Sequence, residues 1–223
     1  MTHNTKISGK LIVIDGTDGS GKATQTKKLI EKLQAVGKNT ETLDFPQYQN
    51  NYFGHMVRSY LDGAFGDPTE INPYLSSVLY AADRFESSKK IKQWLDEGKV
   101  VILDRYVSAN QIHQGGKIKD DQQRETFLNW LDKIEHGIFN IPRPDIILYL
   151  DVDPNISQQA MQIRAPKDGH ESNLDFQKDS HSQSLKLVEQ MNNWQRIQCD
   201  KDGQFLPIEE IHKKIWDVIK NML

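Results

Sequence analysis

The sequence has little cysteine, no long hydrophobic run and almost no excess charge of either sign. A single cysteine, Cys199, among 223 residues excludes an intramolecular disulfide and is typical of a reducing compartment. Lysine and arginine number 28 and aspartate and glutamate number 31, a formal net charge of −3, which disfavours a protein that works by non-specific nucleic-acid binding. The longest apolar runs, such as Ile146–Leu150, are far shorter than the ~20 residues that span a bilayer.

The opening residues, MTHNTKISGK, also lack an apolar stretch long enough for a signal peptide. We therefore expect a soluble, cytoplasmic protein with neither membrane nor nucleic acid as a partner. A chain of this length suits one compact domain, so we expect a single domain over residues 1–223.

Three short runs of mostly aliphatic residues each end on an aspartate: Leu11–Asp15, Val100–Asp104 and Ile146–Asp151. Their nearly continuous apolar character is typical of strands buried on both faces of a parallel sheet. A fourth strand is predicted over Thr40–Phe45, which Pro46 would end. Function in open α/β sheets gathers outside the carboxyl ends of the strands, so the strand-end acids are candidate site residues.

Helical periodicity separates these strands. Apolar spacing, with capping glycines and prolines, predicts helices over Lys22–Val36, Asn72–Glu97, Gln122–His136, Asp175–Asp200 and Ile208–Leu223. Strands that alternate with helices predict an α/β protein with a parallel sheet and helices on both faces. The polar segment 164–174 lies between two predicted helices, and it is either a solvated loop or a functional lid.

A glycine-rich segment follows the first strand. Gly16, Gly21 and Lys22 match the spacing G-x-x-x-x-G-K between a strand and a helix. In such a loop the backbone N–H groups and the helix N-terminus cradle phosphates, and the lysine reaches the β- and γ-phosphates. The candidate ATP-binding residues are Gly16, Thr17, Asp18, Gly19, Ser20, Gly21, Lys22, Ala23 and Thr24.

Two features restrict the kind of nucleotide-binding protein. The strict motif has serine or threonine after the lysine to place a hydroxyl on Mg²⁺, but this chain has Ala23. We therefore expect Mg²⁺ to be held largely through water and by acids elsewhere. The guanine-reading N-K-x-D motif of GTPases is missing, and the chain is short for a motor domain. Among the proteins with a phosphate loop, the class that remains is a kinase for a small nucleotide or nucleoside.

Five segments carry a resemblance to a known family. In chain order they are GTDGSGKATQ (residues 16–25), FPQY (Phe45–Tyr48), YAADR (Tyr80–Arg84), DRYVSANQIHQGG (Asp104–Gly116) and RPDIILYLDVDP (Arg143–Pro154). In this order and spacing, the chain resembles the thymidylate kinase family over most of its length. The resemblance implies a phosphate-loop (P-loop) NTPase fold: a three-layer α/β/α sandwich with a central five-stranded parallel sheet and a flexible lid at about 164–174.

The resemblance also implies the reaction. Family members transfer the γ-phosphate of ATP to dTMP, which gives dTDP and ADP, and they use Mg²⁺. They are usually homodimers, with an interface that helices such as Asn72–Glu97 could supply. We therefore expect ATP and dTMP as substrates and Mg²⁺ as the cofactor.

Roles follow for the acceptor site. Tyr80 would stack on the thymine ring, and Arg84, one helical turn later, would hydrogen-bond the base edge. The i, i+4 spacing puts both on one helix face. Arg105 would clamp the acceptor phosphate. The dTMP-binding residues that the resemblance implies are Asp18, Phe45, Tyr48, Leu61, Tyr80, Arg84, Arg105, Asn110 and Gln114.

The catalytic set implied in the same way is Lys22, Asp18, Arg105 and Arg164. Some thymidylate kinases place an arginine inside the phosphate loop, where this chain has Gly19. The lid must then supply the cation over the transferring group, with Arg164 as the first candidate and Lys167 as the second. Asp104 and Asp18 would position Mg²⁺ through water.

Alternatives stay open. His113 stands where most relatives carry an aromatic residue that packs near the sugar, so a kinase for another monophosphate or for a deoxynucleoside remains possible. A nucleotide-binding protein without catalysis would be favoured by Ala23, whereas the complete acceptor-side set argues against it. Asp151 is interpreted as structural, and Cys199 as inert.

Overall fold

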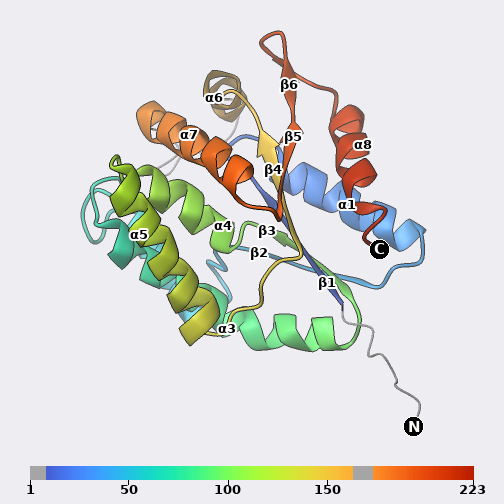
Figure 1. The fold of residues 1–223 in the computed structure, drawn as a ribbon, viewed down its shortest axis with the longest axis horizontal. Coiled ribbons are helices and arrows are strands. Elements are labelled where there is room, and N and C mark those ends of the chain that lie inside the picture. Colours follow the sequence, from blue (N-terminus) through green and yellow to red (C-terminus); the bar gives the residue numbers. More distant parts are fainter. Residues whose placement is uncertain (1–8, 163–172) are drawn as a thin grey trace.

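The structure, a computed structural model, describes residues 9–162 and 173–223. Its centre is a five-stranded sheet in the order β2-β3-β1-β4-β5, in which every neighbouring pair is parallel (Figure 1). The strands are β1 (Lys10–Asp15), β2 (Thr40–Asp44), β3 (Val100–Asp104), β4 (Ile146–Asp151) and β5 (Trp194–Gln198). The predicted five-stranded parallel sheet is therefore confirmed.

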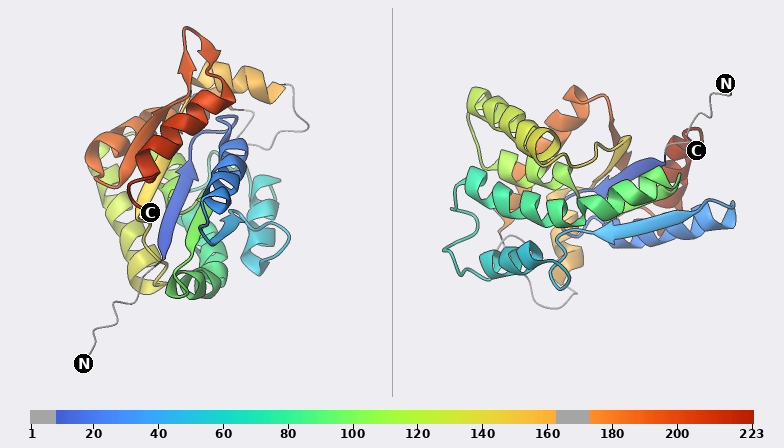
Figure 2. Two further views of the ribbon diagram at one scale, coloured as in Figure 1. Left: turned by 90° about the vertical axis from the view of Figure 1, so that its right-hand side faces the viewer. Right: turned by 90° about the horizontal axis from the view of Figure 1, so that it is seen from below.

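Helices cover both faces of this sheet, which makes three layers (Figure 2). On one face α1 (Lys22–Ala35) packs beside α8 (Ile208–Ile219), and on the other lie α3 (Pro73–Asp96) and α7 (Leu174–Gln190). Successive β1 side chains point to opposite faces. Ile12 and Ile14 accordingly join the core under α1 and α8, while Leu11 and Val13 join the core on the other face. This two-sided burial explains the continuous apolar runs.

Shorter elements complete the described chain. They are α2 (Tyr52–Leu61), α4 (Val107–Ala109), the π-helical turn η1 (Asn110–Gln114), α5 (Asp121–Asp132), the π-helical turn η2 (Lys133–Ile138), α6 (Pro154–Gln162), β6 (Asp200–Lys201) and β7 (Gln204–Phe205). The helix predicted over Gln122–His136 thus changes to a π-helical turn at Lys133. Across the described ranges, none of the helices combines the length and the apolar character that crossing a membrane requires.

The single helix predicted over Asp175–Asp200 is wrong. Helix α7 ends at Gln190, and Trp194–Gln198 forms the edge strand β5. Four apolar residues that run across the end of the helix mimic helical spacing, namely Leu187, Met191, Trp194 and Ile197. The sheet decides the outcome, because the backbone after the helix pairs with β4, beginning with a 2.8 Å hydrogen bond from Ile147 N to Asn193 O.

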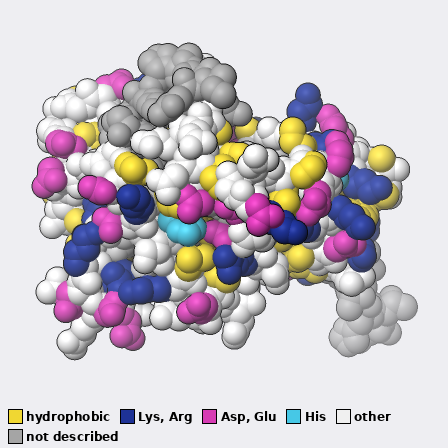
Figure 3. All heavy atoms as spheres, turned by 90° about the horizontal axis from the view of Figure 1, so that it is seen from above, with side chains coloured by type: hydrophobic (Ala, Val, Ile, Leu, Met, Phe, Trp, Pro, Cys, Tyr) yellow, Lys and Arg dark blue, Asp and Glu magenta, His cyan; other side chains and the backbone are white. Residues whose placement is uncertain are grey.

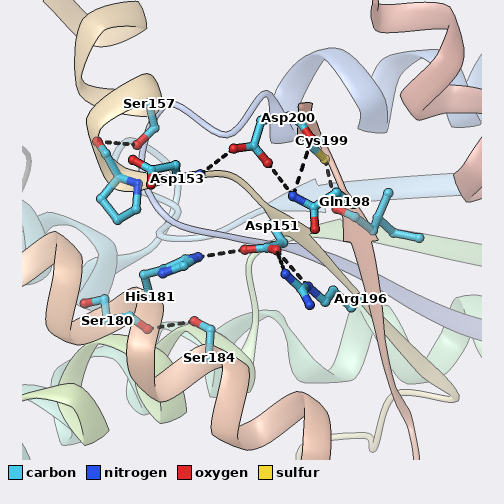
Figure 4. A network of polar contacts seen from close by, with 12 residues as sticks. Asp151, Asp153, Ser157, Ser180, His181, Ser184, Arg196, Gln198, Cys199 and Asp200 are labelled. Atoms are coloured by element: carbon cyan, nitrogen blue, oxygen red, sulfur yellow. Dashed lines mark hydrogen bonds and ion pairs between the residues drawn. The ribbon is translucent and has the colours of Figure 1, made fainter. Parts of the chain in front are cut away.

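Asp151, at the end of β4, ties three elements together (Figure 4). Its Oδ1 lies 2.7 Å from Nε2 of His181 on α7, and its Oδ2 accepts a 2.7 Å hydrogen bond from Nε of Arg196 on β5. Burial alone would raise the pKa of Asp151, but hydrogen bonds from His181 and Arg196 hold it below its ordinary value. The structural interpretation of Asp151 agrees with this arrangement. Cys199 beyond β5 is also buried, and burial raises the pKa of its thiol to about 12.

We expect Asp151→Asn to lower the free energy of unfolding by about 2 kcal/mol at neutral pH, because the Arg196 guanidinium loses its counter-charge and the His181 ring loses a carboxylate partner. Larger losses are not expected, since the Arg196 side chain is 48% exposed. The lowered pKa means that this stabilisation is present above the ordinary aspartate pKa of about 3.9 and disappears as pH falls through the folded-state value. Urea unfolding at a series of pH values measures both effects.

The matched control for Asp151→Asn is Asp179→Asn, which removes an exposed ion pair between Asp179 on α7 and Lys119. We expect this control to change stability little. If the stability difference between wild type and Asp151→Asn stays constant down to the most acidic pH measured, Asp151 is not the source of the stabilisation.

Candidate active site

The loop between β1 and α1 has the geometry of a phosphate cradle. Gly19 has a positive φ of 79°, and an added Cβ would lie 2.6 Å from the Ser157 carbonyl oxygen, so only glycine fits. Lys22 curls back over the loop, and its Nζ donates to the carbonyl oxygens of Gly16 (3.0 Å) and Thr17 (2.8 Å). Burial and nearby Arg105 lower the pKa of this lysine, although Asp18 opposes them.

Two hydroxyl groups of the loop point to a ligand. The side-chain oxygens of Thr17 and Ser20 are buried, and neither has a hydrogen-bond partner among the residues that the structure describes. An unsatisfied buried hydroxyl is costly unless a partner can reach it. Phosphate oxygens would supply acceptors for both, in agreement with the predicted ATP-binding loop.

Asp18 of this loop forms an ion pair with Arg105, which follows β3. Burial alone would lower the pKa of Arg105, but the carboxylates of Asp18, Asp15 and Asp104 raise it. In Asp18, burial raises the pKa and the charges of Arg105 and Lys22 override it, so the pKa is lowered well below its usual range. Both groups are therefore charged at neutral pH.

Arg105 also has an unusual backbone conformation. Its φ is 63°, in the left-handed region that non-glycine residues rarely adopt, and its N–H donates to Ile14 O at 3.0 Å. Strain of this kind costs about 1–3 kcal/mol and is concentrated at functional sites. The conformation turns the guanidinium back across the end of β1 to the phosphate loop.

A cavity of about 260 Å³ opens beside this ion pair. The predicted dTMP-binding residues that line it are Asp18, Phe45, Tyr48, Leu61, Tyr80, Arg84 and Arg105. Four further lining residues are Asp44, Pro46, Ala109 and His113. Most of the acceptor set that was predicted from the resemblance therefore surrounds one cavity. On the face seen from above in Figure 3, acidic and basic side chains lie side by side with a histidine between them.

Arg84 is anchored by a residue that sequence reasoning missed. Its Nε and Nη2 donate to the two carboxylate oxygens of Glu135 at 2.7 and 2.6 Å, and its Nη1 donates to Tyr106 O at 3.1 Å. Glu135 lies on η2, fully buried. A glutamate within a helical pattern gives no signal of such a role, because only packing brings it to Arg84. The predicted contact of Arg84 with the base remains a prediction.

Asn110 and Gln114 lie beside the cavity and are not among its lining residues. The Asn110 amide donates to Glu135 Oε1 at 3.0 Å and to Ser77 O at 3.2 Å. Gln114 accepts a 2.7 Å hydrogen bond from the Ser76 hydroxyl. Both side chains therefore brace η1 against α3, and their predicted contacts with the nucleotide stay untested.

The segment that carries Phe45 and Tyr48 is fixed by a buried carboxylate. Asp83 of α3 accepts hydrogen bonds from Gln47 N at 3.0 Å and from Asn51 Nδ2 at 2.8 Å. Burial raises the pKa of Asp83, and these hydrogen bonds oppose the shift. Asp83 therefore holds one wall of the cavity in place.

A second cleft, of about 230 Å³, lies over the phosphate loop. It is lined by the loop, by Asp104 and by four residues that also line the first cavity, namely Asp18, Asp44, Phe45 and Arg105. A ligand on the loop and a ligand in the cavity would thus meet at the ion pair between Asp18 and Arg105.

Carboxylates that could hold Mg²⁺ are present at this junction. Within the described ranges, the Asp104 side chain makes no hydrogen bond or ion pair, and burial raises its pKa, with Lys22 and Arg105 opposing. The Asp18 oxygens are occupied by Arg105 and by a 3.0 Å hydrogen bond from Gln177 Nε2. Hard oxygen donors suit Mg²⁺, which keeps several waters. Asp104 fits this role better than Asp18.

The lid residues Arg164 and Lys167 lie outside the described residues. The predicted lid extended to residue 174, but Leu174 already belongs to α7. This helix contributes Gln177 to the site, a contact that no sequence pattern indicates.

Known proteins resemble this chain over nearly its whole length. A family model described as thymidylate kinase matches residues 14–215. A probable thymidylate kinase of Pyrococcus horikoshii is 31% identical over 217 residues, which cover 96% of this chain and 98% of the relative. Human thymidylate kinase is 30% identical over 211 residues, with coverage of 93% and 88%. A structure of thymidylate kinase from Candida albicans has a TM-score of 0.76 at 23% identity, covers 96% and 92% of the two chains, and supports the fold.

Proposed function

Because the chain belongs to the thymidylate kinase family, we propose that it transfers the γ-phosphate of ATP to dTMP, giving dTDP and ADP. The observation that carries this proposal is the junction of two sites. A phosphate loop and an acceptor-sized cavity share Asp18 and Arg105. A protein that only bound one nucleotide would have little use for a second cavity with its own phosphate-facing arginine.

The chemistry requires positioning and charge stabilisation. An oxygen of the acceptor phosphate attacks the γ-phosphorus of ATP, a new P–O bond forms, and the bond to the β-phosphate oxygen breaks as ADP leaves. Phosphoryl transfer passes through a loose transition state with charge spread over the transferred group. The loop N–H groups and Lys22 hold the donor phosphates, while Arg105 holds the acceptor phosphate in line and offsets the repulsion between the two anions.

Mg²⁺ and Arg164 would also offset negative charge during the transfer. Mg²⁺, when bound, would neutralise charge on the donor phosphate oxygens, and Asp104 would hold it through water. Arg164 stays our candidate for the cation over the transferring group, since the phosphate loop has Gly19 and no arginine. We also propose a cytoplasmic location, which the single cysteine of the chain supports.

A coupled ADP-release assay with ATP and Mg²⁺ tests the proposal, with dTMP, dUMP, UMP, dCMP and thymidine as acceptors. We expect strong preference for dTMP. Comparable turnover of UMP would retain the kinase and change the acceptor, a result that would draw attention to His113. Absence of acceptor-dependent turnover, with ATP still bound, would contradict the proposed reaction.

We also propose that the protein is a homodimer that uses the outer face of α3. Leu75, Phe85 and Ile138 are 67%, 50% and 67% exposed, and Val78 lies on the same side of α3. The Phe85 ring packs 5.3 Å from that of Phe139, which joins the η2 region to this face. Exposed apolar side chains gathered on one face are typical of association surfaces.

Phe85→Glu is expected to convert such a dimer to a monomer, because it puts a charge at the centre of the apolar face. Sedimentation equilibrium measures the mass. The matched control is Ile208→Glu on α8, where the side chain is similarly exposed at 52%. An unchanged mass for Phe85→Glu, or a monomeric wild type, would contradict the proposed interface.

A further inference from the structure

A short chain of side chains joins α7 to Arg105. Nε2 of His113, on η1, lies 2.9 Å from Nη1 of Arg105, and Nδ1 lies 3.1 Å from Oγ of Ser180 on α7. The imidazole ring stacks on Phe176, with centroids 5.8 Å apart and planes 16° from parallel. Both ring nitrogens and one ring face are thus engaged, in a residue that also lines the acceptor cavity.

The N–H groups of Arg105 indicate which ring nitrogen of His113 carries the proton. A guanidinium has only N–H donors, so Nε2 of His113 must accept the hydrogen bond from Arg105. The proton of the neutral ring then lies on Nδ1, which donates to the Ser180 hydroxyl. An imidazolium would present N–H to N–H at Arg105. The contact therefore corresponds to the tautomer that carries its proton on Nδ1.

Arg105 is consequently held at three points. Its backbone is anchored in the left-handed region by the hydrogen bond to Ile14 O, one terminal nitrogen is paired with Asp18, and the other is bound by His113. Helix α7 supports two of these points, since Gln177 donates to Asp18 and Ser180 contacts His113. Gln177 and Ser180 are three residues apart and lie on one helix face.

We propose that His113 is a positioning residue for the acceptor phosphate, which orients the Arg105 guanidinium through Nε2 and is itself oriented by Ser180. The inference rests on the proposed function and deepens it: His113 contributes to selecting a phosphorylated acceptor over the free nucleoside. A guanidinium binds phosphate well only when its planar fork is aimed correctly, so loss of one support weakens phosphate binding.

Calorimetric titration of dTMP and of thymidine tests this inference. His113→Phe keeps a ring that can stack on Phe176 but removes the acceptor for Arg105. We expect it to weaken dTMP binding about tenfold or more, because a hydrogen bond to a charged group is lost. Thymidine binding, which involves no phosphate, should be nearly unchanged. In the transfer assay, KM for dTMP should rise more than kcat falls.

Two further variants keep the test independent of folding. His113→Gln retains an acceptor and a donor and should restore much of the dTMP affinity. Ser180→Ala leaves the ring in place and should weaken dTMP binding about threefold, the effect of a neutral hydrogen bond. The control is His212→Phe on α8, outside both cavities, which should leave both affinities unchanged. Thermal melting confirms that each variant is folded.

The outcomes separate the inference from the proposed function. Equal losses of dTMP and thymidine affinity in His113→Phe would show that His113 contacts the nucleoside part and would overturn the positioning role. Unchanged dTMP affinity in folded His113→Phe and His113→Gln would overturn it too. A wild-type protein that binds ATP but not dTMP would contradict the proposed function itself, and the inference with it.

Discussion

Arg105→Ala is expected to lower kcat/KM for phosphoryl transfer by about 10³-fold or more, because Arg105 both binds the acceptor phosphate and offsets the repulsion between the two anionic substrates. The guanidinium lies where the two cavities meet and is paired with Asp18. Without this guanidinium, the acceptor phosphate loses its binding partner, and no positive charge offsets the repulsion between the two anionic substrates. ATP affinity should change little, because the loop and Lys22 remain.

Steady-state kinetics with varied dTMP, together with calorimetric ATP binding, separates these effects. The control is Arg143→Ala, which removes an exposed arginine whose ion pair with Asp132 lies on the surface, and which should leave the kinetics unchanged. If Arg105→Ala lost ATP affinity as strongly as it lost turnover, the role of Arg105 would be structural, namely to hold Asp18 and the phosphate loop.

Glu135→Gln is expected to cost about 3–5 kcal/mol in the free energy of unfolding, because it leaves the buried guanidinium of Arg84 without a counter-charge. Both side chains of this pair are almost fully inaccessible to solvent, and the pairing is bidentate. A loss of this size is a large part of the total stability of a domain. Urea unfolding with an activity readout measures it.

The double variant Arg84→Met/Glu135→Leu shows whether the loss of stability comes from an unpaired buried charge or from lost packing. Replacing a whole buried pair by apolar side chains is often neutral for stability, so we expect most of the stability to return. We also expect the double variant to have a higher KM for dTMP than the wild type, since the predicted contact of Arg84 with the base is gone. The control Asp132→Asn breaks an exposed pair and should cost less than about 1 kcal/mol. Similar small losses in Glu135→Gln and in this control would contradict the structural role of Glu135.

Features within one element were predictable from the sequence. The phosphate loop needs only glycines, a lysine and a strand and helix on either side, and the structure has β1 and α1 in those places. The helix predicted over Asn72–Glu97 agrees with α3 to its caps, where Asn72 Oδ1 accepts from Tyr74 N at 2.9 Å. Spacing and capping report backbone geometry directly, so local pattern suffices for such elements.

Features that depend on packing between elements were not predictable. Glu135 reaches Arg84 across 51 residues, and Gln177 reaches Asp18 across 159. Strand β5 has an apolar spacing that fits a helix equally well, and only its pairing with β4 makes it a strand. Likewise His113 was identified from its position, whereas its contact with Arg105 came from the packing of η1 against α7.

The sequence by itself therefore determined the phosphate loop, the alternation of strands and helices, and most of a residue set that the structure brings around one cavity. Local backbone preferences and a resemblance in residue order were enough for these. The tertiary structure decided how those residues are held: which carboxylate anchors Arg84, which helix supports Asp18 and His113, and which strand closes the sheet. Such contacts join residues far apart in the chain, and their partners are selected by the burial and pairing of whole elements, which no local pattern encodes.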